Sequence, residues 1–569
     1  MIGIEGFEAL LRDANVPEDL TFEKLEPFLA SDSLEVRTSV NFELAKRFLQ
    51  SVSPESAEPF IDRAILFYDF GEEKVNGWDK NRIPRYSEEM LHLFVEIKSK
   101  LGKVEDIRRL YRRIGAKFAR SGDVKQALDF FNMALYADVE FGRGDYYVYD
   151  YDILHYVQQM ARARGGRYNL KPPKFLYAHR KIRVACLVYG IWHAESVLVR
   201  ILANIYKFWD KDRFDFKFFV YENASHYPNL AKVIEENKRV LADVGADPVY
   251  AQAASKVEAM LETAHNIRDF KADVVFTTAA LLEYNHYYIV NLLKPPVLVG
   301  LQQGPPPQYV CPGMDWAISW TKHLHISAPA NSSFVVLEKN LPSKMEGSLA
   351  RRRELGIPED APFVVCVGRY VKFRDRGFVE SLLNILRDTP RAYLMLVGLD
   401  KEPDFLAELE SGLTAEERSR FIKRGFAKDY LSLLSLADLV IDTYPSGGGV
   451  VVMDAMSMEI PVLSFRDSYF KTYDQTDWSL AQEFLTHEEL LLPRGDFEEL
   501  RKRARRILAD ESYRRELGRS CRTMALAAKG HPERMAKRCQ DIVEQNFRSR
   551  YEPFAGPIHR LIKTPERES

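Results

Sequence analysis

Two successive series of strands and helices, beginning near residues 183 and 362, constrain the fold of this 569-residue chain more than any other feature. In the first series, short apolar runs such as RVACLVYG and FDFKFFV alternate with segments of helical periodicity. The second series continues the alternation through PFVVCVGR, RAYLMLVGL, DLVIDTYP and IPVLSF. Strands that alternate with helices form parallel sheets covered by helices. We therefore expect two consecutive α/β domains.

Residues 1–165 carry helical periodicity throughout and predict an all-α domain. Within IGAKFARSGDVKQALDFFNMALYAD, Gly122 and Asp123 separate two helices, and Ala127, Phe131 and Ala134 form a small-large-small stripe. This hairpin resembles one tetratricopeptide-type unit, although a generic helical bundle fits the pattern equally well. The expected divisions are 1–165 helical, 180–345 and 346–547 α/β with closing helices, and a tail at 548–569.

Composition excludes several classes of protein. The 80 Lys and Arg residues and 82 Asp and Glu residues give a formal net charge of -2, so we expect no nucleic-acid partner. No apolar run is long enough to cross a membrane, and the N-terminus lacks a secretory signal pattern. The five cysteines show no CxxC spacing, which predicts no zinc site and suits a reducing cytoplasm.

The most informative strand end lies within 438–462. A buried strand ends at Asp442, and Gly447, Gly448 and Gly449 precede a helix that carries Asp454. Ligands bind at the carboxyl ends of strands in open parallel sheets. Glycines let the backbone approach a phosphate, and the free N–H groups of a helix start complement its charge. The alternative is a glycine turn that only permits tight packing of helix on sheet.

Two other strand ends carry polar groups. Arg369 and Lys372 follow PFVVCV and would neutralise a leaving diphosphate without a metal, unless they are only a surface pair. His193 lies after the first strand of the first series and is suited to general base catalysis, unless it only lines the loop. Gln303 and Gly304 begin a rigid, proline-rich loop after another strand.

At these residues the chain resembles a known family. The spacing of Asp442, Thr443, Pro445, Gly447, Asp454 and Pro461 is similar to the UDP-sugar site of the O-GlcNAc transferases and of the bacterial cytoplasmic N-glucosyltransferases. RVACLVYGIWHAESVL and KFWDKDRFDFKFFVYEN resemble the first catalytic strand, its His-containing loop and the following elements of that family. The resemblance covers about 180–480. It implies the GT-B fold, in which two Rossmann-like domains face a cleft, here preceded by an all-α domain.

The resemblance also implies roles for individual residues. His193, Lys372 and Arg369 become the catalytic candidates, with Lys372 on the donor diphosphate. Asp454 would hold the ribose, and Tyr430 would lie against the uracil. The remaining donor-binding positions are Gln303, Gly304, Gly425, Phe426, Ala427, Lys428, Ser446, Gly447, Gly448, Gly449 and Val450. No metal and no cofactor besides the UDP-sugar donor is implied, and the acceptor is a protein side chain or a glycan.

Some alternatives stay open. The polar residues of the family's phosphate loop are replaced here by Gly and Val, which fits a catalytically degenerate scaffold that binds proteins. A retaining GT-B transferase would place a pair of glutamates at Ser446 and Asp454, and the absence of the first favours an inverting enzyme. A UDP-sugar epimerase is a third reading, although it does not account for the helical domain.

Overall fold

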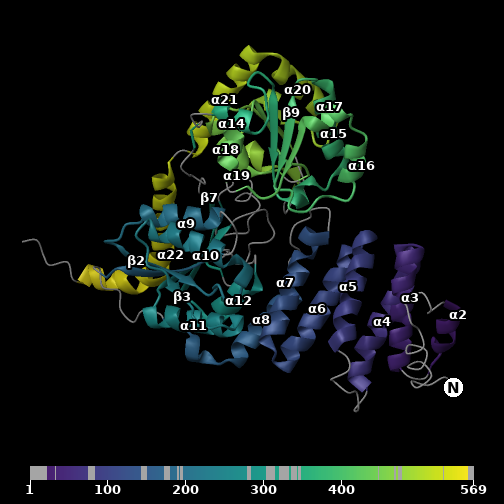
Figure 1. The fold of residues 1–569 in the computed structure, drawn as a ribbon. Coiled ribbons are helices and arrows are strands. Elements are labelled where there is room, and N and C mark those ends of the chain that lie inside the picture. The colour runs from purple at the N-terminus through teal and green to yellow at the C-terminus, as the bar shows by residue number, and fades with distance from the viewer. Residues whose placement is uncertain are drawn as a thin grey trace, which may run out of the picture. The chain divides into compact units, whose positions relative to one another are not determined.

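The computed structural model describes residues 22–31, 34–74, 84–141, 150–171, 180–188, 191, 196–277, 283–302, 314–319, 332–334, 342–343, 348–427, 429–445, 447–466, 470–471, 477–529 and 531–561. These residues form two compact units (Figure 1). The first unit comprises residues 1–115 and 133–142, and the second comprises 116–132 and 143–569.

The first unit is helical, as expected. Its helices are α2 (Phe22–Leu25), η2 (Glu26–Phe28), α3 (Leu34–Ser51), α4 (Pro54–Lys74), α5 (Pro84–Lys100), most of α6 (Val104–Ser121) and the end of α7 (Val124–Phe141). Phe48 and Phe60 stack between α3 and α4 with their ring centroids 5.0 Å apart. Gly122 joins α6 to α7 with φ at +83°, a conformation that favours glycine.

A buried lysine ties helices of this unit together. Lys98 of α5 pairs with Glu58 and Asp62 of α4, at 2.6 and 2.8 Å, and with Asp106 of α6 at 3.3 Å. Burial lowers the pKa of Lys98, but the hydrogen bonds that its ammonium donates to Asp62 and Glu58, and their charges, outweigh burial, and the net shift is upward. The lysine therefore stays charged inside the helical layer.

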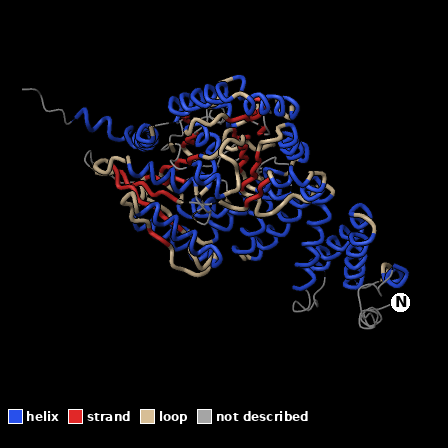
Figure 2. Tube along the Cα trace, turned by 45° about the horizontal axis from the view of Figure 1, so that its top comes forward, coloured by secondary structure: helices blue, strands red, loops and turns tan. Residues whose placement is uncertain are grey.

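The second unit contains the two predicted parallel sheets, with helices on their faces (Figure 2). The first sheet has the strand order β3-β2-β1-β4-β5-β6-β7. Its strands are β1 (Ile182–Leu187), β2 (Phe214–Val220), β3 (Val249–Tyr250), β4 (Val274–Thr277), β5 (Val297–Gln302), β6 (Trp316–Ser319) and β7 (Ser332–Phe334). The helices are α9 (Val197–Lys207), α10 (Ala231–Ala242), α11 (Lys256–Phe270) and α12 (Tyr284–Leu293).

The second sheet has the order β10-β9-β8-β11-β12-β15. Its strands are β8 (Phe363–Val367), β9 (Tyr393–Val397), β10 (Phe421–Arg424), β11 (Leu439–Ile441), β12 (Val462–Phe465) and β15 (Leu491–Leu492). The helices are α14 (Ser348–Glu354), η5 (Tyr370–Phe373), α15 (Arg376–Asp388), α16 (Leu406–Ser411), α17 (Ala415–Ser419), α18 (Tyr430–Ser435), α19 (Gly449–Ser457), η6 (Leu480–Glu483), η7 (Glu488–Leu490), α20 (Phe497–Ala509) and α21 (Glu511–Lys529). Two short strands, β13 (Phe470–Lys471) and β14 (Asp477–Trp478), pair antiparallel.

The fold class is confirmed, and the last helix extends beyond its expected end. The last helix, α22 (Pro532–Leu561), continues past 547 into the region expected to be a tail. It contacts α9 and β5 of the first α/β domain (Figure 1). Arg550 of this helix pairs with Asp315. Where the chain passes from one α/β domain to the other, β7 belongs to the first sheet, whereas Arg352 of α14 is buried and pairs with Asp438 beside the second.

The first half of α7 and the helix α8 (Tyr151–Ala163), which both belong to the second unit, pack on the first α/β domain. The Asn132 side chain accepts a hydrogen bond from the backbone N–H of Tyr284 at 2.8 Å, and Gln158 donates to the Tyr287 hydroxyl at 2.6 Å. The phenyl ring of Phe131 meets Tyr284 edge-on. These contacts fix the last part of the helical region to α12.

Candidate functional site

The candidate site lies at the carboxyl edge of the second sheet, where the strand order reverses. Strand β9 lies on one side of β8, and β11 lies on the other. The loops that follow β8 and β11 therefore leave the sheet side by side at its switch point, which is where open α/β sheets bind ligands. The first loop carries Arg369 and Lys372, and the second leads from Asp442 through Gly447 into α19.

Lys372 points into the glycine turn. It lies in η5, is half-buried, and donates from Nζ to the backbone carbonyl of Gly447 at 2.7 Å. Burial lowers the pKa of Lys372 to about 8, with Arg369 adding to the effect and Asp442 opposing it. A bound phosphate would place negative charge beside Lys372 and would stabilise its charged form.

Asp442 closes the turn. Its Oδ1 accepts the backbone N–H groups of Thr443 at 2.9 Å and Gly448 at 2.7 Å, and its Oδ2 accepts the Ser464 hydroxyl at 2.8 Å. Burial raises the pKa of Asp442, while Lys372 and these hydrogen bonds oppose the rise. The carboxylate thus joins the end of β11 to the start of α19.

The glycines of this site lie where neighbouring backbone or side-chain atoms leave no room for a Cβ atom. A Cβ atom on Gly447 would lie 2.5 Å from Oδ2 of Asp442. Gly398, after β9, has φ at +96°, and a Cβ there would lie 2.1 Å from the carbonyl oxygen of Gly368. A side chain at Gly447 or Gly398 would therefore displace the loops that carry Lys372 and Asp442.

The start of α19 is suited to an anion. Gly448 is its N-cap residue and makes no side-chain capping bond, and Gly449 and Val450 begin the helix. The first N–H groups of a helix have no partner within it, and the helix dipole adds positive potential there. Lys372, Arg369 and this helix start are the predicted phosphate-binding groups that the structure describes.

Tyr430 and Asp454 meet beside this turn. The Tyr430 hydroxyl, at the start of α18, donates to Oδ2 of Asp454 at 2.8 Å. Asp454 is buried, and burial together with this carboxylate raises the pKa of Tyr430. The two residues assigned to uracil and ribose are therefore neighbours, and a ribose hydroxyl would compete with Tyr430 for the carboxylate.

The loop after β10 carries three of the other predicted positions, Gly425, Phe426 and Ala427. The backbone N–H of Phe426 donates to Oδ1 of Asp400 at 2.6 Å, and the Phe426 side chain is 50% exposed. Asp400, which follows β9, was not predicted. Ligands bind at the carboxyl ends of parallel strands, and Asp400 stands at such a position at the end of RAYLMLVGLD, so the sequence did contain a signal for it.

Several predicted site residues lie outside the described part of the chain. They are His193, Gln303, Gly304, Lys428 and Ser446. Their assigned roles stay predictions.

The carboxyl edge of the first sheet holds a buried polar cluster that the sequence analysis missed. Glu283 accepts hydrogen bonds from Tyr221 and Asn285 and lies 3.1 Å from Nζ of Lys256. Glu222, which directly follows Tyr221, accepts the backbone N–H of Ile191 at 3.3 Å. The strand FDFKFFV ends at Val220, directly before Tyr221 and Glu222, so the position of these residues after a strand was a signal in the sequence.

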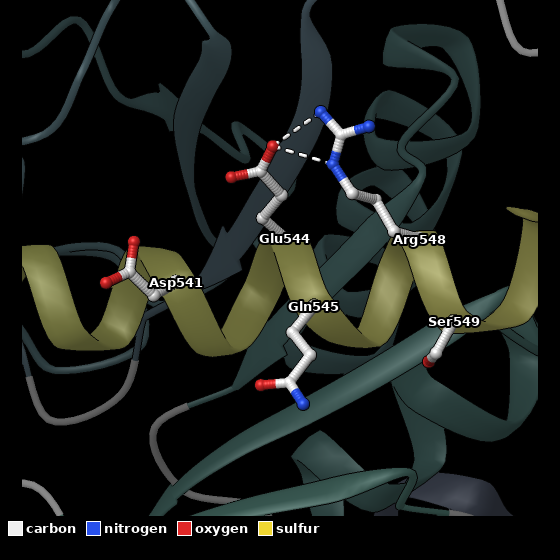
Figure 3. A pocket seen from close by; sticks show the side chains of 5 residues that line it. All are labelled: Asp541, Glu544, Gln545, Arg548 and Ser549. Carbon is white, nitrogen blue, oxygen red and sulfur yellow. Dashed lines mark hydrogen bonds and ion pairs between the residues drawn. The ribbon is translucent and has the colours of Figure 1, made fainter.

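A separate pocket lies on α22 (Figure 3). It is lined by Asp541, Glu544, Gln545, Arg548 and Ser549. Arg548 donates to Glu544 at 2.8 Å from Nε and 2.6 Å from Nη2, and Arg213 of the first α/β domain also pairs with Glu544. Glu544, Arg548 and Arg213 pair with one another, and the Arg213 ion pair joins α22 to the first α/β domain. This pocket is therefore a poor candidate for a substrate-binding site.

Within the described residues, no three His, Cys, Asp or Glu side chains gather as metal ligands would. No helix in the same part of the chain has the length and apolar character needed to cross a membrane.

Comparison with known proteins finds a family and a relative that are similar to this domain. Residues 349–524 fit the model of the family described as glycosyl transferases group 1. The lipopolysaccharide core biosynthesis glycosyltransferase LpsE of Rhizobium meliloti (strain 1021) is 29% identical over 167 residues, which are 29% of this chain and 45% of that protein. The chain thus matches less than half the length of this curated relative.

Similar solved structures include a mutant of the Thermobaculum terrenum O-GlcNAc transferase. It has a TM-score of 0.47 and 15% identity, and the similarity covers 92% of this chain and 99% of that one. Another is the Anabaena protein HepE in complex with UDP and glucose, with a TM-score of 0.48, 14% identity, and 64% and 99% of the two chains covered.

Residues 349–524, which include the second sheet and the candidate site, therefore match the family of group 1 glycosyl transferases. The chain places this domain after a first parallel α/β domain, which is the expected GT-B succession.

Proposed function

We propose that this chain is a UDP-sugar-dependent glycosyltransferase that moves a hexose or N-acetylhexosamine to a protein side chain without a metal. One observation carries the proposal. Within a glycosyltransferase group 1 domain, Lys372 lies between the 447–449 turn and Asp442, at the switch point of the sheet.

The diphosphate would bind where positive groups converge. Its oxygens would replace the Gly447 carbonyl as the partner of the Lys372 ammonium, and the N–H groups at the start of α19 would donate to them. Arg369, which is exposed directly before η5, adds a second cation. As the sugar leaves, these groups stabilise the negative charge that develops on UDP.

The nucleoside would lie beside the diphosphate. Tyr430 offers a ring to the uracil, the loop at 425–428 runs alongside, and Asp454 accepts from the ribose. His193, or a group not yet identified, would take the proton from the acceptor in an inverting displacement.

A second acceptor class is a glycan. The relative LpsE is named for lipopolysaccharide core biosynthesis, which favours a sugar acceptor. The helical first unit, which a glycan transferase does not require, favours the protein acceptor. A scaffold that has lost transferase activity would bind partners without turning over any donor.

Sugar transfer tests the proposal directly. The full chain is incubated with radiolabelled UDP-glucose or UDP-N-acetylglucosamine, EDTA, and separate protein and lipopolysaccharide fractions of its source organism. We expect label in protease-sensitive material. Label confined to the lipopolysaccharide fraction would select the glycan acceptor, and no transfer from any UDP-sugar would contradict the enzyme.

Matched variants locate the chemistry. Lys372→Ala should lower turnover by about a hundredfold, since removal of one group that stabilises transition-state charge has about this effect. Lys502→Ala is the control, because Lys502 is an exposed lysine of α20 that pairs only with Glu499 in the described structure. Full turnover by Lys372→Ala would show that the assigned mechanism is wrong.

A further inference from the structure

A cavity of about 500 Å³ lies in the helical part of the second unit, outside the candidate active site. Its lining residues come from the end of α6, the start of α7 and the second half of α8. Its lining includes Arg120, Val124, Tyr156, Gln159, Met160 and Arg164. The volume lies within the range of about 300–1,000 Å³ that is typical of ligand pockets.

The charge of this cavity is entirely positive. Arg120 and Arg164 line it, and no carboxylate is among its lining residues. Both side chains are exposed, and neither forms an ion pair with a carboxylate that the structure describes. Burial raises the pKa of Tyr288, and the charge of Arg164 opposes that rise, so this guanidinium also faces Tyr288. The cavity therefore presents two cations that no described carboxylate neutralises.

The floor of the cavity is apolar. Met160 and Val124 are 5% and 6% exposed, and the ring of Tyr156 stacks on Phe131. Gln159, which is exposed at the rim, bonds to His155 at 2.7 Å. An apolar floor beneath a polar and cationic rim suits a ligand with both hydrocarbon and carboxylate groups, such as a peptide.

The start of α7 argues against a phosphate ligand. A phosphate would use the free N–H groups of this helix start, but Asp123 already accepts the N–H of Gln126 at 3.1 Å. Planar carboxylates, which guanidinium groups bind through paired hydrogen bonds, fit better.

We propose that this cavity binds an acidic segment of a polypeptide, with Arg120 and Arg164 holding its carboxylates and the Met160 floor receiving an apolar side chain. The proposal goes beyond the donor site and does not depend on sugar transfer. It gives the helical region a recognition function of its own.

Fluorescence polarisation tests the proposal with the full chain. The probe is a short fluorescein-labelled peptide of alternating glutamate, alanine and leucine, and the comparison peptide carries glutamine in place of glutamate. We expect the acidic peptide to bind at least tenfold more tightly, and salt to weaken it, because exposed ionic contacts are screened. Equal binding of the two peptides, or no binding of either, would overturn the proposal.

Charge-neutral variants place the binding. Arg120→Gln and Arg164→Gln should each weaken the acidic peptide about tenfold. Arg162→Gln is the control, because Arg162 is an exposed arginine of the same α8 that does not line the cavity. Circular dichroism checks that each variant is folded. Weakening by Arg162→Gln alone, or displacement of the peptide by UDP, would place the binding elsewhere and overturn the proposal.

Discussion

At the scale of single residues, the site depends on one lysine whose charge is only partly compensated. Burial places the pKa of Lys372 at about 8, although Asp442 and the Gly447 carbonyl lie beside it. A bound diphosphate would add the missing negative charge and raise this pKa. The structure therefore links donor binding to the uptake of a proton.

This linkage predicts a pH dependence. Below pH 8 Lys372 is an ammonium in the free protein, so UDP binds without a protonation cost. Above that pH the free lysine is neutral and must be protonated on binding, so affinity falls by up to about tenfold per pH unit. Calorimetry of UDP binding between neutral and alkaline pH measures this fall.

Two variants are matched to this prediction. Lys372→Arg keeps its charge at all these pH values and should bind UDP with a flat profile. Asp442→Asn removes the carboxylate that opposes the downward shift, so its affinity should begin to fall at a lower pH than that of the wild type. A wild-type profile that is flat through pH 8 would contradict the linkage.

At the scale of elements, the strand-end rule anticipated most of the second sheet and its site. The sequence PFVVCVGR became β8, DLVIDTYP became β11, and the glycine turn became the start of α19. Apolar runs bounded by Gly and Pro mark buried parallel strands, so this part of the fold is local information. Strand β3, which has two residues, carries too little pattern to be recognised.

Long-range contacts explain what the sequence did not predict. Glu283 and Lys256 are 27 residues apart, and Asn132 meets Asn285 across 153 residues. Buried carboxylates resemble surface residues until the fold brings their partners to them. The pairing of Tyr430 with Asp454 was also not foreseen, because each was assigned separately to the nucleoside.

The helical unit allows a stability prediction. Lys98→Ala leaves Glu58, Asp62 and Asp106 without their shared cation, so the free energy of unfolding of this unit should fall by about 2 kcal/mol. The carboxylates are partly exposed, which keeps the loss below that of a fully buried pair. Hydrogen exchange measured on α4 and α5 reports the local free energy directly.

Lys100→Ala provides the control for this variant. Lys100 is an exposed neighbour on α5 whose ion pair with Glu96 spans one turn. Exposed pairs of this kind contribute less than about 0.5 kcal/mol, so exchange should be nearly unchanged. Equal protection losses in both variants would show that the buried cluster has no special role.

At the scale of the whole molecule, the chain combines a helical unit with two α/β domains, and a final helix that contacts the first of those domains. The glycosyltransferase match lies in the second α/β domain, whereas the arginine-lined cavity lies among the helices. We therefore place binding of the sugar donor and recognition of a polypeptide in different parts of the chain.

Its central claim is that Lys372 and the start of α19 bind the diphosphate of a UDP-sugar without a metal. Calorimetry of the full chain with UDP, GDP and ADP, all with EDTA present, tests this most directly. We expect UDP to bind in preference to the others. The Lys372→Ala substitution should weaken UDP binding by about 2 kcal/mol, or roughly thirtyfold, and Lys502→Ala should leave it unchanged. No binding of any nucleotide, or equal affinity of wild type and Lys372→Ala for UDP, would contradict it.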